Sequence, residues 1–116
     1  MKVKTTELTR AALNWAVAKC IYELDDVVIC DGRVFAYDDA TNGFNPSTDW
    51  EQGGPIIERE KLCITASVEG DWTAFCVSDE MDMQWICRGP TPLVAAMRCY
   101  VASKMGDEIE LPEELK

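Results

Sequence analysis

The clearest helix signals in the chain lie in residues 91–106, which read TPLVAAMRCYVASKMG. Thr91 is a good N-cap residue, and Pro92 suits the first helical position, where its missing N–H would have no partner. Gly106 can end the helix at its C-terminal side. Two adjacent stripes run along it, composed of Leu93, Met97, Tyr100, Val101 and Lys104, and of Val94, Met97, Val101 and Met105. We predict a helix over residues 92–105.

Most of the chain before this helix reads as short strands. The runs 62–68, 72–77 and 83–88 are rich in β-branched and aromatic residues, and Leu62, Ile64, Ala66 and Val68 are expected on one face. The run 27–30 and the run 33–37 predict a hairpin through Asp31-Gly32. Residues 3–5 permit a short edge strand, with lysines beside it. Thr9 can cap a helix over residues 10–22.

This order of elements predicts the α+β class. We expect a small single domain with a mostly antiparallel sheet of about five strands and two main helices packed on one face. The domain is predicted to span residues 1–106. Residues 107–116 form an acidic C-terminal tail that either adds a short edge segment or is disordered.

Size and composition are those of an ordinary globular domain. The 116 residues are 47% hydrophobic and 28% charged, and no apolar run approaches the roughly 20 residues of a membrane span. The first ten residues, MKVKTTELTR, contain no apolar core of a secretory signal. We therefore expect no membrane association and a reducing cytoplasmic setting.

The cysteines and the missing histidines bear on metal and catalytic chemistry. Cysteines stand at positions 20, 30, 63, 76, 87 and 99, without a C-x-x-C pair, and the chain has no histidine. We expect free thiols that serve as small core residues, no metal site and no cofactor. The segment Asp79–Asp82 lacks the pattern of an EF-hand loop.

Catalytic motifs are also missing from the sequence. Without histidine, the usual Ser–His and Cys–His nucleophile pairs cannot form. The chain has no P-loop and no G-x-G-x-x-G segment. Neighbours such as Asp25-Asp26 and Asp38-Asp39 point apart on a strand and are expected to be exposed acids. We predict that the protein is not an enzyme.

The net charge of −10 argues against direct binding of nucleic acids, which depends on basic groups that release counterions. Acids cluster at 23–39, at 79–82 and at 107–114. They form either a solvated surface that favours solubility, or a functional surface that mimics a nucleic-acid backbone or docks on a basic partner. Their irregular spacing does not decide between the two.

The best site candidate is the stretch 44–59, FNPSTDWEQGGPIIER. Its Asn, Pro, Ser, Asp and Gly residues favour turns, so we predict a loop, with a short helical turn after Pro46 and either a helical turn or a strand from Ile56. Trp50 in such a loop either docks on the protein body or presents itself to a ligand. We expect Trp50 to stack on a ligand whose polar edges contact Ser47, Thr48 and Asp49.

Three arginines are the candidate partners of a phosphate group. The guanidinium groups of Arg59, Arg88 and Arg98 can each bind phosphate through two parallel hydrogen bonds, or form surface ion pairs with the many acids. Trp72 belongs either to the core or to the open face of the sheet, where it would join this ligand site. The predicted ligand is a small nucleotide.

Three blocks of the sequence resemble the NinX family of small phage proteins. They are residues 44–60, the segment Gly70-Asp71-Trp72-Thr73-Ala74, and residues 89–101, in that order, and the opening MKVKTTELTRAALNWAVAKC is similar to the start of that family. The resemblance covers nearly the whole chain. The positions that it implies to be recurrent are Pro46, Asp49, Trp50, Gly54, Pro55, Ile56, Ile57, Glu58, Trp72, Ala74, Ala96, Met97 and Arg98.

The resemblance implies a phage accessory protein in the cytoplasm of a bacterial host, and it supplies no catalytic residues because the family has no known function. Such proteins often counter host defence, and Pro46–Trp50 is loosely similar to the P-S-x-x-D-[LW] segment of a family that sequesters immune nucleotides. We therefore expect a non-enzymatic binding protein, plausibly an anti-defence sponge for a nucleotide signal that works as a homo-oligomer. The alternative is an acidic inhibitor that docks on a host protein.

Overall fold

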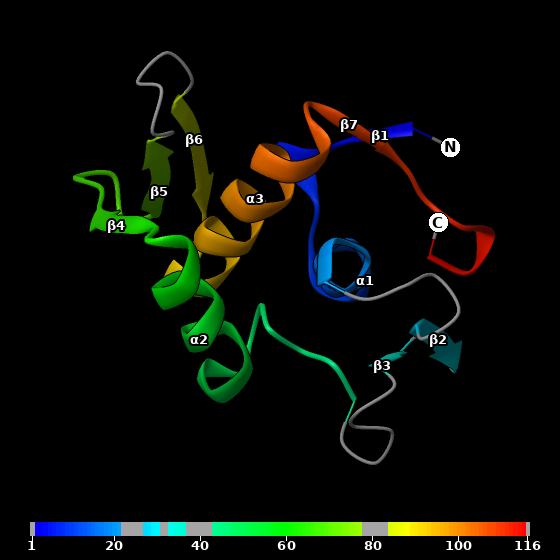
Figure 1. The fold of residues 1–116 in the computed structure, drawn as a ribbon. Helices are drawn as coiled ribbons and strands as arrows, with labels where there is room; N and C mark the ends of the chain where they lie inside the picture. The colour runs from blue at the N-terminus through cyan, green and yellow to red at the C-terminus, as the bar shows by residue number, and fades with distance from the viewer. Residues whose placement is uncertain (1, 22–26, 31–32, 37–42, 78–83, 116) are drawn as a thin grey trace.

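The computed structural model describes residues 2–21, 27–30, 33–36, 43–77 and 84–115 (Figure 1). The described elements are, in chain order, β1 (Lys2–Lys4), the 3-10 turn η1 (Thr5–Glu7), α1 (Arg10–Ile21), β2 (Val27–Cys30), β3 (Arg33–Ala36), α2 (Trp50–Glu60), β4 (Cys63–Ala66), β5 (Trp72–Val77), β6 (Gln84–Gly89), α3 (Pro92–Met105), β7 (Glu108–Glu110) and the 3-10 turn η3 (Glu113–Leu115).

The α+β class is confirmed, but the single sheet of about five strands with two helices is wrong. The described strands form three separate antiparallel sheets, ordered β1-β7, β2-β3 and β4-β5-β6, and three α-helices accompany them. Helix α3 lies between the sheet β4-β5-β6 and helix α1, and the hairpin β2-β3 packs on α1 (Figure 1). The helices therefore separate strands that the sequence pattern alone would join.

Helix α3 is the centre of the core, and its predicted bounds and caps are confirmed. The Thr91 hydroxyl accepts a hydrogen bond from the Val94 amide, and Gly106 follows the last turn with φ of 87°. The helix contacts all three strands of one sheet, both other α-helices, η1 and β7. Its buried residues are Leu93, Ala95, Ala96, Met97, Cys99, Tyr100, Val101 and Ala102. The small side chains among them allow neighbours to approach from several sides.

The prediction of a loop over residues 44–59 is wrong after Asp49, because residues 50–60 form helix α2. The Asp49 carboxylate accepts a hydrogen bond from the Glu51 amide at 3.0 Å and caps the helix. The Gln52 side chain reaches back, accepting from the Asn45 amide at 2.6 Å and donating to the Gly43 carbonyl at 3.2 Å. These caps and the buried Ile56 stabilise a helix whose Gly-Gly-Pro segment favours a turn.

Residues 43–49 connect this helix to the rest of the molecule. The Phe44 amide donates to the Val34 carbonyl at 2.6 Å, and Thr48 and Asp49 donate to the Asn45 carbonyl. Phe44 itself is buried in the core. The part of the predicted loop that precedes Asp49 is thus a turn, and the hydrogen bond from Phe44 to Val34 joins it to β3.

The predicted strands are confirmed, with shorter bounds in places. The hairpin β2-β3 pairs Val27 with Ala36 and Cys30 with Arg33, whereas its Asp31-Gly32 turn and Tyr37 lie outside the described residues. The strand predicted over residues 62–68 is shorter than expected, and of the four residues expected on one face, Leu62 is buried whereas Ala66 and Val68 are exposed. The strand ends at Ala66, and Val68 lies in a turn closed by a hydrogen bond from the Gly70 amide to the Ser67 carbonyl.

The acidic stretch at the C-terminal end contains strand β7, which pairs with β1 so that Val3 lies opposite Ile109. Ile109 and Leu111 are buried. Lys2 and Lys4 lie directly opposite Glu110 and Glu108, a cross-strand arrangement of opposite charges that is favourable. Among the described residues, no helix has the length and apolar character that a membrane span requires.

The neighbouring glycines of α2 provide a test of its packing. A Cβ atom on Gly53 would lie 2.6 Å from Leu93 Cδ2 and would also overlap the Pro46 carbonyl, whereas one on Gly54 would meet nothing within 4 Å. We expect Gly53→Ala to lower the free energy of unfolding by about 1–3 kcal/mol through steric strain. Gly54→Ala should raise it by up to about 1 kcal/mol, because alanine is the better helix former.

The measurement is urea denaturation followed by circular dichroism. Equal effects of the two substitutions would contradict the close contact of α2 with residues 46 and 93.

Candidate functional site

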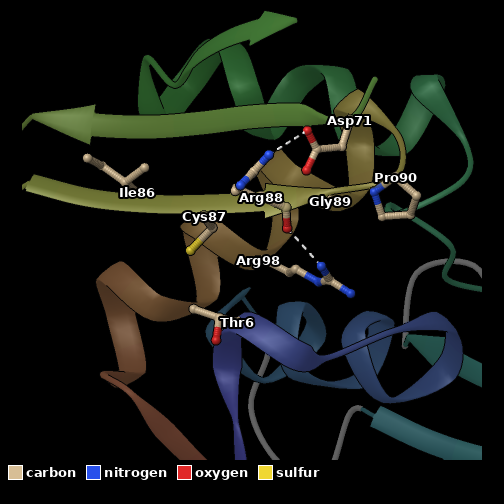
Figure 2. Close-up of a pocket in the computed structure, with 8 residues that line it drawn as sticks. All are labelled: Thr6, Asp71, Ile86, Cys87, Arg88, Gly89, Pro90 and Arg98. Carbon is tan, nitrogen blue, oxygen red and sulfur yellow. Dashed lines mark hydrogen bonds and ion pairs between the residues drawn. The ribbon is translucent and has the colours of Figure 1, made fainter. Parts of the chain in front are cut away.

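Two pockets flank the connection between β6 and α3, and five of the eight predicted site residues line one or the other. The first, which we name the Arg98 pocket, has a volume of about 500 Å³ and is lined by residues 86–90 with Thr6, Asp71 and Arg98 (Figure 2). The second, the Trp50 pocket, has a volume of about 230 Å³ and is lined by Ser47, Thr48, Trp50 and residues 91–94. Gly89-Pro90 thus borders one pocket and Thr91-Pro92 the other.

The side chain of Arg98 is fixed in place by two backbone carbonyls. Its Nε donates to the Leu8 carbonyl at 2.7 Å, and its Nη1 donates to the Arg88 carbonyl at 2.7 Å (Figure 2). Burial lowers the pKa of this guanidinium, since the charged form loses part of its hydration. Among the described residues no carboxylate forms an ion pair with Arg98, although Glu7 acts on it weakly through its charge. Within the described part of the chain, Arg98 is thus a half-buried cation without a bonded counter-ion.

Arg88, by contrast, is neutralised by two carboxylates on the outer side of β6. Its Nη2 lies 2.8 Å from Glu69 Oε2 and 2.9 Å from Asp71 Oδ1, and the hydrogen bond from Arg88 lowers the pKa of Asp71. Figure 2 shows Arg88 turned toward Asp71, whereas Arg98 and Cys87 lie on the opposite side of the strand. Arg88 therefore stabilises the β4–β5 turn against β6.

Trp50 is the first residue of α2 and has 55% of its surface exposed. The other three tryptophans, Trp15, Trp72 and Trp85, are half-buried and pack against the core. Thr48, which is exposed, stands beside Trp50 at the same pocket. This pair is the part of the predicted Ser47–Trp50 site that faces solvent most openly.

Ser47 and Asp49 have structural partners in the protein. Ser47 is buried, and its amide and hydroxyl donate to Asn14 Oδ1 on α1 at 3.1 and 2.7 Å. Asp49 caps α2, as described above. These two polar side chains hold the turn in place. Ser47 lines the Trp50 pocket, but its amide and hydroxyl donors are already bonded to Asn14.

Arg59 and Trp72 border neither pocket. Arg59 donates from Nε to Glu60 at 3.0 Å and from Nη2 to the Tyr100 hydroxyl at 3.3 Å, at the interface of α2 with α3. Burial alone would raise the pKa of Glu60, but the hydrogen bond from Arg59 and the nearby Lys104 lower it. Trp72 lies on β5 opposite Gly89, where it packs against the core.

The sequence did not indicate Thr6 and Cys87 as pocket residues. Thr6 comes from the N-terminal turn and reaches the pocket only through the tertiary fold, so no spacing in the sequence signals it. Cys87 could have been found, because alternation along β6 places it on the face opposite Ile86 and Arg88.

The six cysteines are free thiols, but the expectation that all of them serve as core residues is wrong. Cys87 and Cys99 are buried, and Cys20 and Cys76 are half-buried. Cys30 and Cys63 are exposed because they lie at solvent-facing positions of β2 and β4. Within the part of the chain that the structure describes, no three Cys, Asp or Glu side chains are arranged to hold a metal. The acidic pairs at 25–26 and 38–39 and the segment 79–82 lie outside it.

The Asn14–Ser47 contact gives a test of the structural role of Ser47. In Asn14→Ala, two buried donors of Ser47 lose their acceptor, and we expect the free energy of unfolding to fall by about 2–4 kcal/mol. Thr48→Ala, at the exposed neighbouring position, should change it by less than about 0.5 kcal/mol. Urea denaturation measures both. A stable Asn14→Ala variant would show that Ser47 does not depend on α1.

The comparison of this chain with protein families gives a match that covers most of its length. A family model described as Bacteriophage P22, NinX matches residues 4–104. The matched range includes the lining of both pockets, helices α1 and α2, all of α3 but its last residue, and strands β2 to β6. No curated protein sequence matches the chain. The match extends over well above half of the chain and confirms the resemblance seen in its three sequence blocks. The chain therefore belongs to the NinX family of phage proteins.

Proposed function

We propose that this phage protein binds a small nucleotide-type ligand at the β6–α3 connection without converting it, and that it acts by withdrawing this ligand from the host's defence. In this proposal Arg98 holds a phosphate group in its pocket. Trp50 stacks on the base from the other side of the connection. The ligand is released intact, so the protein is a sequestering protein and not an enzyme.

The observation that supports this proposal most strongly is the uncompensated charge of Arg98. The chain has 21 acidic residues against 11 basic ones, and the described ion pairs of Arg59, Arg88 and Lys104 each use a carboxylate. Arg98 instead contacts two carbonyls. A half-buried cation is costly without an anion, so a phosphate in the pocket would gain a charge-assisted interaction there.

The geometry of Arg98 also favours an anion. A guanidinium has five N–H donors, and the two hydrogen bonds to carbonyls use one on Nε and one on Nη1. Among the described residues nothing accepts from Nη2. Because two hydrogen bonds already fix the Arg98 guanidinium, the side chain loses little conformational entropy when a ligand binds, and this favours affinity. The Thr6 hydroxyl lies at the same pocket and can donate a further hydrogen bond.

The negative groups near the pocket are partly neutralised already. Asp71 borders the Arg98 pocket, but its carboxylate is paired with Arg88 at 2.9 Å. The net charge of −10 repels an anion at long range, and salt screens such repulsion beyond about 8 Å. Short-range contacts with Arg98 therefore decide binding in this proposal.

The Trp50 pocket supports the same ligand class. It lies at the N-terminal ends of α2 and α3, where the positive ends of the helix dipoles favour negative groups. The exposed Trp50 ring offers a flat surface for a base, and stacking of this kind contributes about 1–3 kcal/mol. In this proposal the ligand has two recognised parts, one for each of the pockets on the two sides of residues 89–92.

A thermal-shift screen tests the proposal with cyclic dinucleotides, cyclic trinucleotides and ADP-ribose isomers. A ligand at 100 times its Kd adds about 2.7 kcal/mol, which corresponds to a rise in Tm of roughly 10 °C for a domain of this size. We expect such a rise with the wild-type chain and recovery of the ligand intact by chromatography. Trp50→Ala should reduce the rise.

The matched variants are Arg98→Gln and Arg59→Gln, each of which removes one positive charge. Arg98 lies in its pocket, and Arg59 lies at the interface of α2 with α3. Loss of a charge-assisted hydrogen bond of about 1.5–3 kcal/mol in Arg98→Gln should raise the Kd about 10- to 150-fold. Arg59→Gln should bind as the wild type does. Each variant is compared with its own ligand-free Tm, so a general loss of stability does not affect the result. No shift with any nucleotide, or recovery of a converted product, would contradict the proposal.

A further inference from the structure

Two thiols meet between the sheet β4-β5-β6 and helix α3. Helix α3 packs on one face of this sheet, the face that contains the buried Ala74 of β5 (Figure 1). Cys76, two positions further along β5, lies on the same face because side chains alternate along a strand. The Cys99 Sγ of α3 lies 3.8 Å from the Cys76 Sγ. The fold thus brings together two thiols that are 23 positions apart in the sequence.

The two thiols differ in their access to solvent. Cys99 is buried, and its thiol donates to the Trp85 carbonyl at 3.3 Å. Cys76 is half-buried. A solute in the surrounding water therefore reaches Cys76 first, and Cys99 is in contact with it from the side of the core.

The separation of the two sulfurs is close to that in a disulfide. An S–S bond is about 2.0 Å long, so the sulfurs have to approach by about 1.8 Å. Cys99 gives up its hydrogen bond to the Trp85 carbonyl when it loses its proton. Because the fold already holds the sulfurs in contact, bond formation avoids the entropic cost of closing a loop in an unfolded chain.

We propose that Cys76 and Cys99 form a reversible disulfide pair that exchanges with low-molecular-weight disulfides such as oxidised glutathione. The bond fastens β5 covalently to α3. It encloses residues 77–98, and these include most of the lining of the Arg98 pocket, namely residues 86–90 and Arg98 itself. The redox state of the surrounding solution thereby acts on the packing of the sheet against the helix that carries Arg98.

The exchange proceeds in two steps. The Cys76 thiolate attacks one sulfur of oxidised glutathione, a mixed disulfide forms, the glutathione S–S bond breaks, and one glutathione leaves as a thiolate that takes up a proton. Cys99, losing its proton, then attacks the Cys76 sulfur, the mixed disulfide breaks, and the second glutathione leaves in the same way. Two protein thiols are oxidised by two electrons, and one glutathione disulfide is reduced to two glutathione molecules.

The test incubates the folded wild-type chain in buffers of reduced and oxidised glutathione, quenches the exchange with acid, blocks the remaining thiols and maps the peptides by mass spectrometry. Trypsin leaves Cys63, Cys76 and Cys87 in one peptide, residues 62–88, so a second protease that cleaves at Asp and Glu is needed. We expect a peptide pair linked through Cys76 and Cys99, lighter by two hydrogen atoms than the free peptides.

Cys20 is the internal control, because it is also half-buried but lies on α1. Burial raises its pKa to about 11, so it should remain reduced. The exposed Cys30 and Cys63 should gain the mass of glutathione instead of losing hydrogen. No nucleotide enters these measurements, so the thiol pair and the proposed nucleotide site can fail independently.

A second control repeats the incubation in denaturant. For a loop of this length, the equilibrium constant for the Cys76–Cys99 bond should be about 10- to 100-fold higher in the folded chain than in the denatured chain. An equal constant in both would overturn the proposal, because the fold would then contribute nothing to the pairing.

Two variants sharpen the result. In Cys99→Ala the exchange should stop at the first step, with glutathione bound to Cys76. Cys87→Ala removes the other thiol of the neighbouring strand and should form the same disulfide as the wild type. A link from Cys99 to Cys87, or glutathione on Cys76 of the folded wild type with Cys99 still reduced, would overturn the proposal.

Discussion

The burial of most of helix α3 is the constraint on which the rest of this structure depends. A helix that contacts a sheet, two helices and both end segments of the described chain needs small residues, and Ala95, Ala96 and Ala102 provide them. Gly89 meets the same demand from the sheet side, since a Cβ atom there would lie 2.7 Å from the Ala95 amide. A helix so enclosed leaves little room for a charge, and Arg98 is accommodated because two carbonyls receive it.

The elements with complete local signals could be predicted from the sequence. Helix α3 has its cap, its proline and its terminal glycine, and the hairpin strands alternate in the expected way. Helix α2 could not be predicted, because Gly53, Gly54 and Pro55 have low helix propensity, and the interactions that outweigh it come from Gln52 and from the burial of Ile56. The division into three sheets has no local signal either, since it follows from the position of α3 between them.

The candidate site shows a similar limit. Residue types alone pointed to three arginines, and nothing in their spacing distinguishes them. In the described structure Arg59 pairs with Glu60, Arg88 pairs with Glu69 and Asp71, and Arg98 donates to backbone carbonyls. Counter-ions are supplied by the tertiary fold, and they decide which cation remains attractive to a ligand. The polar run before Trp50 was likewise a reasonable ligand site by composition, yet Ser47 is satisfied by Asn14 on another helix.

The pairing of β1 with β7 has a consequence for how this protein comes to be folded. Thr5 bonds to the carbonyls of Gly106 and Asp107, so a chain emerging from the ribosome cannot complete this seam until about a hundred further residues have been made. Closing such a long loop is entropically unfavourable and tends to be slow. Until then Val3 has no strand partner, and α3 lacks its cover at one end. The pairing of residues 2–5 with residues 106–110 is thus a late step in the folding of this domain.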